Sequence, residues 1–119
     1  MPNLNDLLVD RVKNSWTEVS QSTANAAVTV THAAVAGRRH IITKVDASYS
    51  SSTVSAELTV SQGATVIGRK YIHGAGAIDF GVDGLYNPDA NEAVSATLAA
   101  GGSGVTGDLT LQGFSTDGN

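Results

Sequence analysis

From residue 16 onward, hydrophobic residues recur at every second position of the chain. Residues 53–60, TVSAELTV, show the pattern most clearly, with apolar side chains at Val54, Ala56, Leu58 and Val60. Such alternation predicts a β-strand that buries one of its two faces. Similar runs, separated by turns rich in Gly, Asn, Pro and Ser, predict strands at residues 16–21, 26–33, 39–49, 53–60, 64–73, 77–82, 92–100 and 108–114. Short strands at this spacing, about eight of them, predict an antiparallel β-sandwich or barrel.

The alternation also predicts which side chains face the core. In residues 39–49, the strand period places Ile41 on the same face as Val45, Ala47 and Tyr49. The other predicted core positions are Val28, Val30, Ile78, Phe80, Val94, Ala96, Leu98, Leu109 and Leu111. The intervening positions are rich in Thr and Ser, as expected for strands that turn one face toward water.

The N-terminus follows a helical period instead. In residues 3–14, NLNDLLVDRVKN, four apolar residues fall at i, i+3, i+4 and i+8 and predict one stripe on a short helix: Leu4, Leu7, Leu8 and Val12. Asn3 is the predicted N-cap. Because so short a helix is marginal alone in water, we expect it to dock on its own domain, a neighbouring subunit or a larger partner. The chain thus divides into an arm, residues 1–15, and a β-sandwich domain, residues 16–119.

The composition narrows the range of functions. The chain carries 7 Lys and Arg against 11 Asp and Glu, a net charge of −4, so we expect no nucleic-acid partner. It has no cysteine, which excludes disulfides, thiol nucleophiles and cysteine-based zinc sites. No apolar run reaches the roughly 18 residues of a membrane span, and the N-terminus lacks the pattern of a signal peptide. We therefore expect a soluble protein that is made in a cytoplasm and has no membrane partner.

The predicted core is small. Aromatic residues make up 5% of the chain and alanine is frequent, so each buried position removes little apolar area from water. A core of this kind is marginal, and we therefore expect the protein to gain stability as a homo-oligomer.

One glycine-rich segment matches a ligand-binding pattern. Residues 102–107, GSGVTG, fit the G-x-G-x-x-G fingerprint of dinucleotide-binding loops. That fingerprint requires a helix to follow, whereas residues 108–114 alternate with the period of a strand. We therefore interpret Gly102, Gly104 and Gly107 as turn glycines of the last hairpin, and we predict no cofactor.

The polar residues do not point to catalysis or to a metal. His32 and His40 are expected to lie near each other at the ends of one hairpin, but no acid stands at a fixed spacing from them. The acidic residues on the predicted strands or at their ends form no distinctive pair for acid–base chemistry: Asp46, Glu57, Asp79 and Asp83. The sequence also lacks a Gly-x-Ser-x-Gly elbow. We therefore predict a protein that is not an enzyme and that holds no metal.

Three segments of the predicted sandwich carry a familiar order of strands and turns. They are residues 33–52 (AAVAGRRHIITKVDASYSSS), 63–80 (GATVIGRKYIHGAGAIDF) and 91–114 (NEAVSATLAAGGSGVTGDLTLQGF). Together they resemble a group of small phage and prophage virion proteins, in which an AG-basic-H-hydrophobic-I-T strand leads into DASYS. In that group NEAVSATLAA-G-GVTG leads into a final L-x-GF. The resemblance covers roughly residues 24–114.

The resemblance implies a jelly-roll β-sandwich that serves as a minor structural protein of the virion. The role it implies is a capsid decoration, or cement, protein, often a homotrimer, that binds the major capsid protein on the head exterior. The group supplies no catalytic residues. Such a protein is synthesised in the host bacterial cytoplasm and ends on the capsid surface.

Two sets of residues are candidates for contact with a partner. The apolar stripe of the arm is expected to meet a sister subunit or the major capsid protein. The basic pair Arg38 and Arg39, which follows a turn at Gly37, is expected either to meet an anionic surface or to form a solvated corner.

An alternative function is a carbohydrate- or receptor-binding module of a virion fibre or appendage, since β-sandwiches host many functions. Sugar binding requires exposed aromatic rings on which a sugar stacks. Tyr71 and Tyr86 are the two candidates, and saturable glycan binding that is lost on replacement of Tyr86 would favour this alternative.

Overall fold

The computed structural model describes residues 14–118, in which every regular element is a strand. The strands are β1 (Ser15–Gln21), β2 (Val28–His32), β3 (Arg38–Tyr49), β4 (Ser55–Gln62), β5 (Thr65–His73), β6 (Ala75–Asp79), β7 (Val94–Leu98) and β8 (Gly107–Asp117). The eight predicted strands are therefore confirmed, with ends that shift by three residues at most. The predicted helix, with Leu4, Leu7, Leu8 and Val12, lies outside the described residues.

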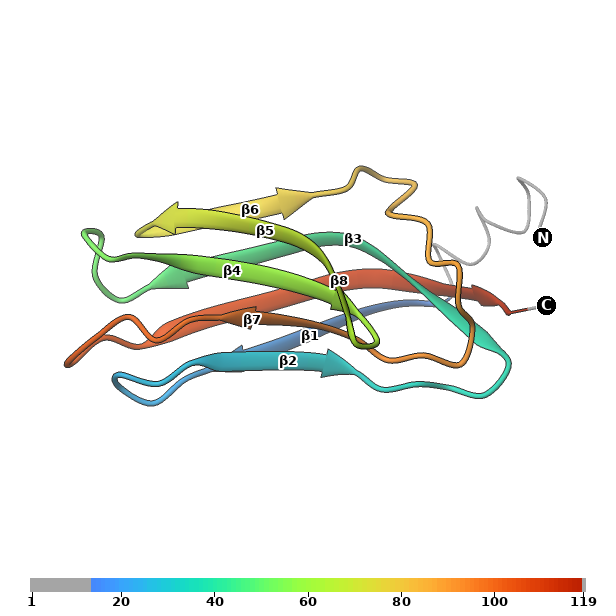
Figure 1. The fold of residues 1–119 in the computed structure, drawn as a ribbon, viewed down its shortest axis with the longest axis horizontal. Helices are drawn as coiled ribbons and strands as arrows, with labels where there is room; N and C mark the ends of the chain where they lie inside the picture. Colours follow the sequence, from blue (N-terminus) through green and yellow to red (C-terminus); the bar gives the residue numbers. More distant parts are fainter. Residues whose placement is uncertain (1–13, 119) are drawn as a thin grey trace.

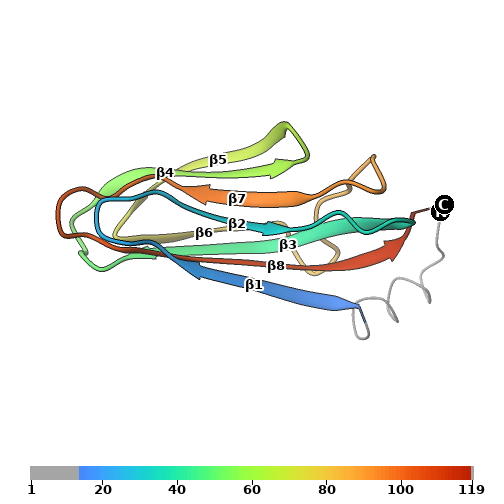
Figure 2. The ribbon, with the colours of Figure 1, turned by 90° about the horizontal axis from the view of Figure 1, so that it is seen from below.

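The strands form two antiparallel layers of four. One layer has the order β1-β8-β3-β6 and the other the order β5-β4-β7-β2. At one corner the layers are continuous, because β5 and β6 pair there through His73 and Ala75. Figure 2 shows the two layers lying face to face. This arrangement is the β-sandwich that the hydrophobic alternation predicts.

The strand pairing is nested. β4 pairs with β5, β3 with β6, β2 with β7 and β1 with β8, so the chain behaves as one long hairpin folded at the β4–β5 turn. The pairs β3–β8 and β4–β7 then complete the two layers. As a result, among the described strands only β4 and β5 both follow each other in the sequence and lie side by side within one layer (Figure 1).

This nesting corrects two expectations from the sequence. Residues 102–107 do not turn a hairpin, because β7 and β8 belong to different layers and the loop between them crosses the end of the sandwich. His32 and His40 do not flank a hairpin either, since β2 pairs with β7 while β3 pairs with β6 and β8.

The core lies between the layers and is built from alternate positions of their strands. The apolar side chains with no exposed surface are Ile42, Val45, Leu58, Val60, Val94, Leu98, Leu109 and Leu111. Full burial of a Val, Leu or Ile side chain contributes about 1.5–3 kcal/mol to the free energy of unfolding. All of these except Ile42 are positions that the sequence assigned to the core.

A β-bulge in β3 explains the exception. The register of β3 against β8 shifts between Ile42 and Lys44, so Thr43 is an extra residue on β3. A bulge of this kind reverses the face on which the following side chains lie. After the bulge Val45 points inward as predicted, but before it Ile42 belongs to the core cluster and Ile41 does not. The prediction that Ile41 shares a face with Val45 is therefore wrong.

The loop between β7 and β8 depends on two glycines. Gly102 and Gly104 have φ angles of +103° and +72°, a region that residues with a side chain rarely adopt. The Val105 N–H donates to the Gly102 carbonyl oxygen at 3.1 Å, which closes a tight turn. The Val105 side chain packs against the core. The G-x-G-x-x-G pattern thus serves the geometry of a crossing loop.

Substitution of Gly104 tests this reading of the loop. A β-carbon added at Gly104 meets nothing within 4 Å, so the cost of a side chain there is conformational rather than steric. We expect Gly104→Val to lower the free energy of unfolding by about 1–2 kcal/mol, the cost of a left-handed conformation. Gly104→Asn should lose less, because Asn enters that region more readily. Urea unfolding measures both variants, and a Gly104→Val protein as stable as the parent would contradict the account.

Candidate functional site

Aromatic rings gather where β1 and β2, the terminal strands of the two layers, lie near each other. Trp16 of β1 stacks on His32 of β2, with ring centroids 4.0 Å apart and an angle of 10° between the planes. His40 of β3 meets His32 edge-on at 4.4 Å. We call Trp16, His32, His40 and Ser115 the ring cluster. The expected proximity of the two histidines is thus present, although no hairpin produces it.

Hydrogen bonds fix the tautomer of neutral His40. Its Nε2 lies 2.8 Å from the carbonyl oxygen of Ala33, and its Nδ1 lies 2.7 Å from Ser115 Oγ. A carbonyl oxygen only accepts, so Nε2 carries the proton and Nδ1 accepts from the Ser115 hydroxyl. Trp16 Nε1 donates to the same hydroxyl oxygen at 3.1 Å. Each polar atom in this chain of bonds has a partner that suits neutral His40.

Burial strengthens this preference for the neutral imidazole. The His40 side chain is 1% exposed. This burial lowers the pKa of His40 below its ordinary value of 6.5, the hydrogen bond to Ala33 opposes the shift, and the charge of nearby His32 adds to it. His32 in turn has its Nδ1 3.4 Å from Glu18 Oε2 on β1.

The serine and histidine of the ring cluster resemble a nucleophile and its base only in composition. Ser115 is 8% exposed, and its hydroxyl is already bonded to His40 and Trp16. A catalytic nucleophile has to reach the reacting atom of a substrate. The geometry instead links β1, β2, β3 and β8 by side chains, so the ring cluster acts as a clamp between the two layers.

The predicted basic pair is divided between different environments. Arg39 donates from Nη1 to the carbonyl oxygen of Asn87 at 2.5 Å and from Nη2 to that of Gly118 at 3.4 Å. Its guanidinium carbon lies 5.7 Å from the centre of the Tyr86 ring. Arg38 is half-buried and pairs in register with Asp117. Arg39 therefore holds the β6–β7 loop to the end of the chain, a structural task that the sequence did not reveal.

The acidic side chains have separate partners. Asp46 lies 3.7 Å from Lys44 Nζ, and Glu57 lies 3.2 Å from Arg69 Nη1. Asp79 accepts a hydrogen bond of 2.7 Å from the backbone N–H two residues further on. Within residues 14–118, no group of three or more His, Cys, Asp or Glu side chains is arranged to hold a metal ion.

A second apolar region lies on the outer face of the β1-β8-β3-β6 layer. Ile41 and Phe114 are register partners that point away from the core cluster, yet they are only 6% and 3% exposed. The β6–β7 loop runs close to Ile41, since the Leu85 N–H donates to the Ile42 carbonyl oxygen at 2.9 Å. An open groove of about 520 Å³ lies beside Phe114 and reaches Val82. Sequence reasoning missed this region because it placed Ile41 in the core.

The exposed aromatic rings are the two that the sequence singled out. Tyr71 is 77% exposed and Tyr86 is 62% exposed, whereas Tyr49 and Phe114 are buried. The Tyr86 ring lies beside the guanidinium of Arg39, and Tyr71 stands on the outer face of β5.

These features define an antiparallel β-sandwich whose terminal strands are clamped by rings. Its sequence matches no protein-family model and no curated protein sequence. Among solved structures the fold is similar to PRD1 vertex protein P5, with a TM-score of 0.52 and 11% identity over 85% of this chain and 96% of that chain. At this identity the likeness shows the fold alone.

A second solved structure is the C-terminal CBM6 of LamC, a marine laminarinase from Zobellia galactanivorans. It has a TM-score of 0.39 and 6% identity over 87% of this chain and 95% of that chain, and this likeness carries no argument. Among residues 14–118 there is no apolar helix long enough to cross a membrane.

The ring cluster predicts a pH-dependent stability. The unfolded chain protonates His40 near its ordinary pKa of about 6.5, whereas the folded chain does so only at lower pH. The unfolded state therefore binds more protons below that pH, and stability falls as the pH falls from 6.5 toward the pKa of the folded state, by at most about 1.4 kcal/mol per pH unit.

We expect His40→Gln to be less stable at pH 7.5 by about 1–3 kcal/mol, because a buried hydrogen bond is lost. The variant should lose less stability than the parent when the pH is lowered from 7.5 to 5. Urea unfolding at a series of pH values measures both quantities. Parallel pH profiles for the two proteins would show that His40 is not the group responsible.

Proposed function

We propose that this chain is a non-enzymatic structural protein of a phage virion and that its sandwich is a jelly roll. The observation that carries the proposal is the nested pairing of β1–β8, β2–β7, β3–β6 and β4–β5 over two layers of four strands. Jelly rolls are eight-stranded double sheets that recur in viral capsid domains. Two further observations support it: the sequence resemblance of residues 24–114 to virion proteins, and a backbone similar to that of a vertex protein over 85% of the chain.

The finer role that we propose is capsid decoration. A decoration protein binds the lattice of the major capsid protein on the head surface and stabilises the shell by adding interface across its junctions. Such a role needs contact area rather than a reactive group. A stable interface buries an area of the order of 1,000 Å². Ser115, His40 and Arg39 are already hydrogen-bonded within the sandwich, which favours this role over catalysis.

The outer face of the β1-β8-β3-β6 layer is the candidate contact face. Val19 on β1 and Val82 beside the groove are 70% and 76% exposed, so both offer apolar area to a partner. The same face also carries the ion pair of Lys44 and Asp46, and the outer face of the other layer carries Thr29, Thr97 and Arg69. We propose that this face meets a sister subunit in a homotrimer or the major capsid protein.

The arm is the second proposed contact. Among the described residues, the buried core cluster runs from Val28 to Leu111. An apolar stripe on a short helix is suited to binding in a groove of a partner. We propose that Leu4, Leu7, Leu8 and Val12 bind the major capsid protein or a sister subunit.

Removal of the arm tests the proposed function. Because β1 begins at Ser15, deletion of residues 1–13 leaves every described strand intact. We expect the truncated protein to keep the circular dichroism spectrum of the sandwich and to bind capsids at least about tenfold more weakly. Co-sedimentation with capsids that lack the protein measures the affinity.

Point variants separate the stripe from the rest of the arm. Leu7→Asp combined with Leu8→Asp should weaken capsid binding as the deletion does, and Asp10→Asn, off the stripe, should leave it unchanged. Capsid binding by the truncated protein with the affinity of the full chain would overturn the role of the arm. A full chain that binds no capsid at all would overturn capsid decoration.

A further inference from the structure

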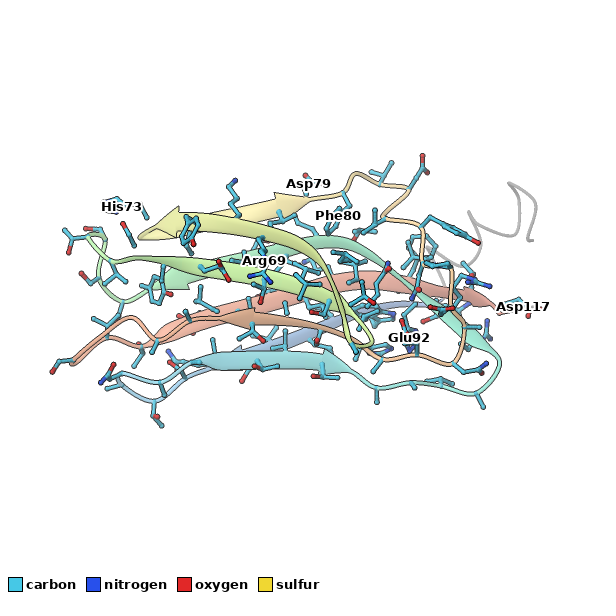
Figure 3. The ribbon with its side chains drawn as sticks, in the orientation of Figure 1. Arg69, His73, Asp79, Phe80, Glu92 and Asp117 are labelled. Atoms are coloured by element: carbon cyan, nitrogen blue, oxygen red, sulfur yellow. The ribbon has the colours of Figure 1, made fainter. Side chains whose placement is uncertain are left out.

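Tyr71 stands among polar side chains on the outer face of the β5-β4-β7-β2 layer. Leu58 is buried in the core, so its ladder partner Lys70 lies on the inner side and Tyr71 on the outer side. Arg69 and His73, two residues away in each direction, share the outer face with Tyr71. Figure 3 shows Arg69 over β4 and β5, and His73 near the end of β5.

The polar neighbours of Tyr71 are held in place by β4. Arg69 Nη1 donates to Glu57 Oε1 at 3.2 Å, and His73 Nδ1 lies 2.6 Å from Ser55 Oγ. Both bonds draw these side chains toward β4, and the Tyr71 ring stays 77% exposed. The result is an apolar ring between two hydrogen-bonded polar pairs. We call these five residues the Tyr71 face.

The Tyr71 ring is accessible from above the sheet, since it is 77% exposed. β5 pairs with β6 in the ladder only between His73 and Ala75, and Lys70 Nζ donates to the Ala77 carbonyl oxygen of β6 at 2.9 Å. A ligand can therefore approach the ring from above the sheet. Side chains two residues apart on a strand are separated by about 7 Å, so groups at the rim of a ring stacked on Tyr71 reach the neighbouring polar pairs.

We infer that the Tyr71 face binds a neutral hexose unit of a polysaccharide. A pyranose ring offers an apolar C–H face, which suits an exposed tyrosine, a rigid amphipathic side chain that loses little entropy on binding. The hydroxyls around the ring both donate and accept, and the face supplies guanidinium donors, carboxylate acceptors and a hydroxyl. Because Arg69 and Glu57 neutralise each other, the face favours an uncharged sugar over an acidic one.

Tyr86 does not offer an equivalent site. Arg39 lies 5.7 Å from the centre of its ring and is itself bound to backbone carbonyl groups of Asn87 and Gly118. The Tyr86 ring therefore belongs to an internal contact, and this difference makes Tyr86 a matched control for Tyr71. The inference goes beyond capsid decoration and does not depend on it.

Glycan binding tests the inference. Neutral oligosaccharides of glucose, galactose and mannose are screened on an array beside acidic oligosaccharides, and the best ligand is titrated by calorimetry. We expect saturable binding of a neutral oligosaccharide that Tyr71→Ala weakens at least about tenfold. Tyr71→Phe, which keeps the ring, and Tyr86→Ala should bind as the parent does.

Three results would overturn the inference. The first is that no neutral oligosaccharide binds saturably, and the second is that only acidic oligosaccharides bind. The third is that Tyr71→Ala binds with the same affinity as the parent. Thermal unfolding of Tyr71→Ala shows that the variant is folded, which is expected at so exposed a position. Capsid co-sedimentation of the same variant keeps the two proposals apart, since it should remain unchanged if only sugar binding is lost.

Discussion

The β-bulge at Thr43 is the constraint on which much of the structure depends. It lies in β3, which pairs with β8 on one side and β6 on the other, and it reverses the face of that strand. Before the bulge, His40 and Ile42 turn inward, and His40 completes the clamp with Trp16 and His32. Ile41 turns outward and becomes part of the second apolar region. The Thr43 carbonyl oxygen also accepts from the Phe80 N–H at 2.8 Å, which fixes the start of the β6–β7 loop.

The sequence predicted the strands and most of the core because alternation reports the two faces of a strand directly. The prediction from alternation failed at Ile41, because the extra residue Thr43 exchanges the inner and outer faces of β3. The two successive isoleucines, Ile41 and Ile42, indicate that both faces of β3 are covered by apolar groups there. The prediction also assumed hairpins between neighbouring strands, whereas nested pairing sends most neighbours to opposite layers. The sequence indicated that His32 and His40 lie near each other, but not their contact with Trp16 and Ser115. The bond between Trp16 and Ser115 joins residues 99 positions apart and depends on how the strands pair.

The two proposed contacts lie on opposite outer faces of the sandwich. The β1-β8-β3-β6 face has exposed Val19, the Lys44–Asp46 ion pair and a groove beside Phe114, and we propose it for contact with protein. The opposite face has hydroxyl groups, the Arg69–Glu57 ion pair and the Tyr71 ring, and we propose it for contact with a polysaccharide. A sandwich attached to a capsid through one face leaves the other toward solvent. Both proposals therefore fit one orientation on the head.

The central claim is that this chain is a structural component of a virion head. Cryo-electron microscopy of intact virions from a phage whose genome carries this sequence tests that claim most directly. We expect density for a two-layered sandwich at symmetric positions on the outer surface of the capsid, with the β1-β8-β3-β6 face toward the shell or a sister subunit. Virions that lack this density, and that contain no copies of the chain by mass spectrometry, would contradict the claim.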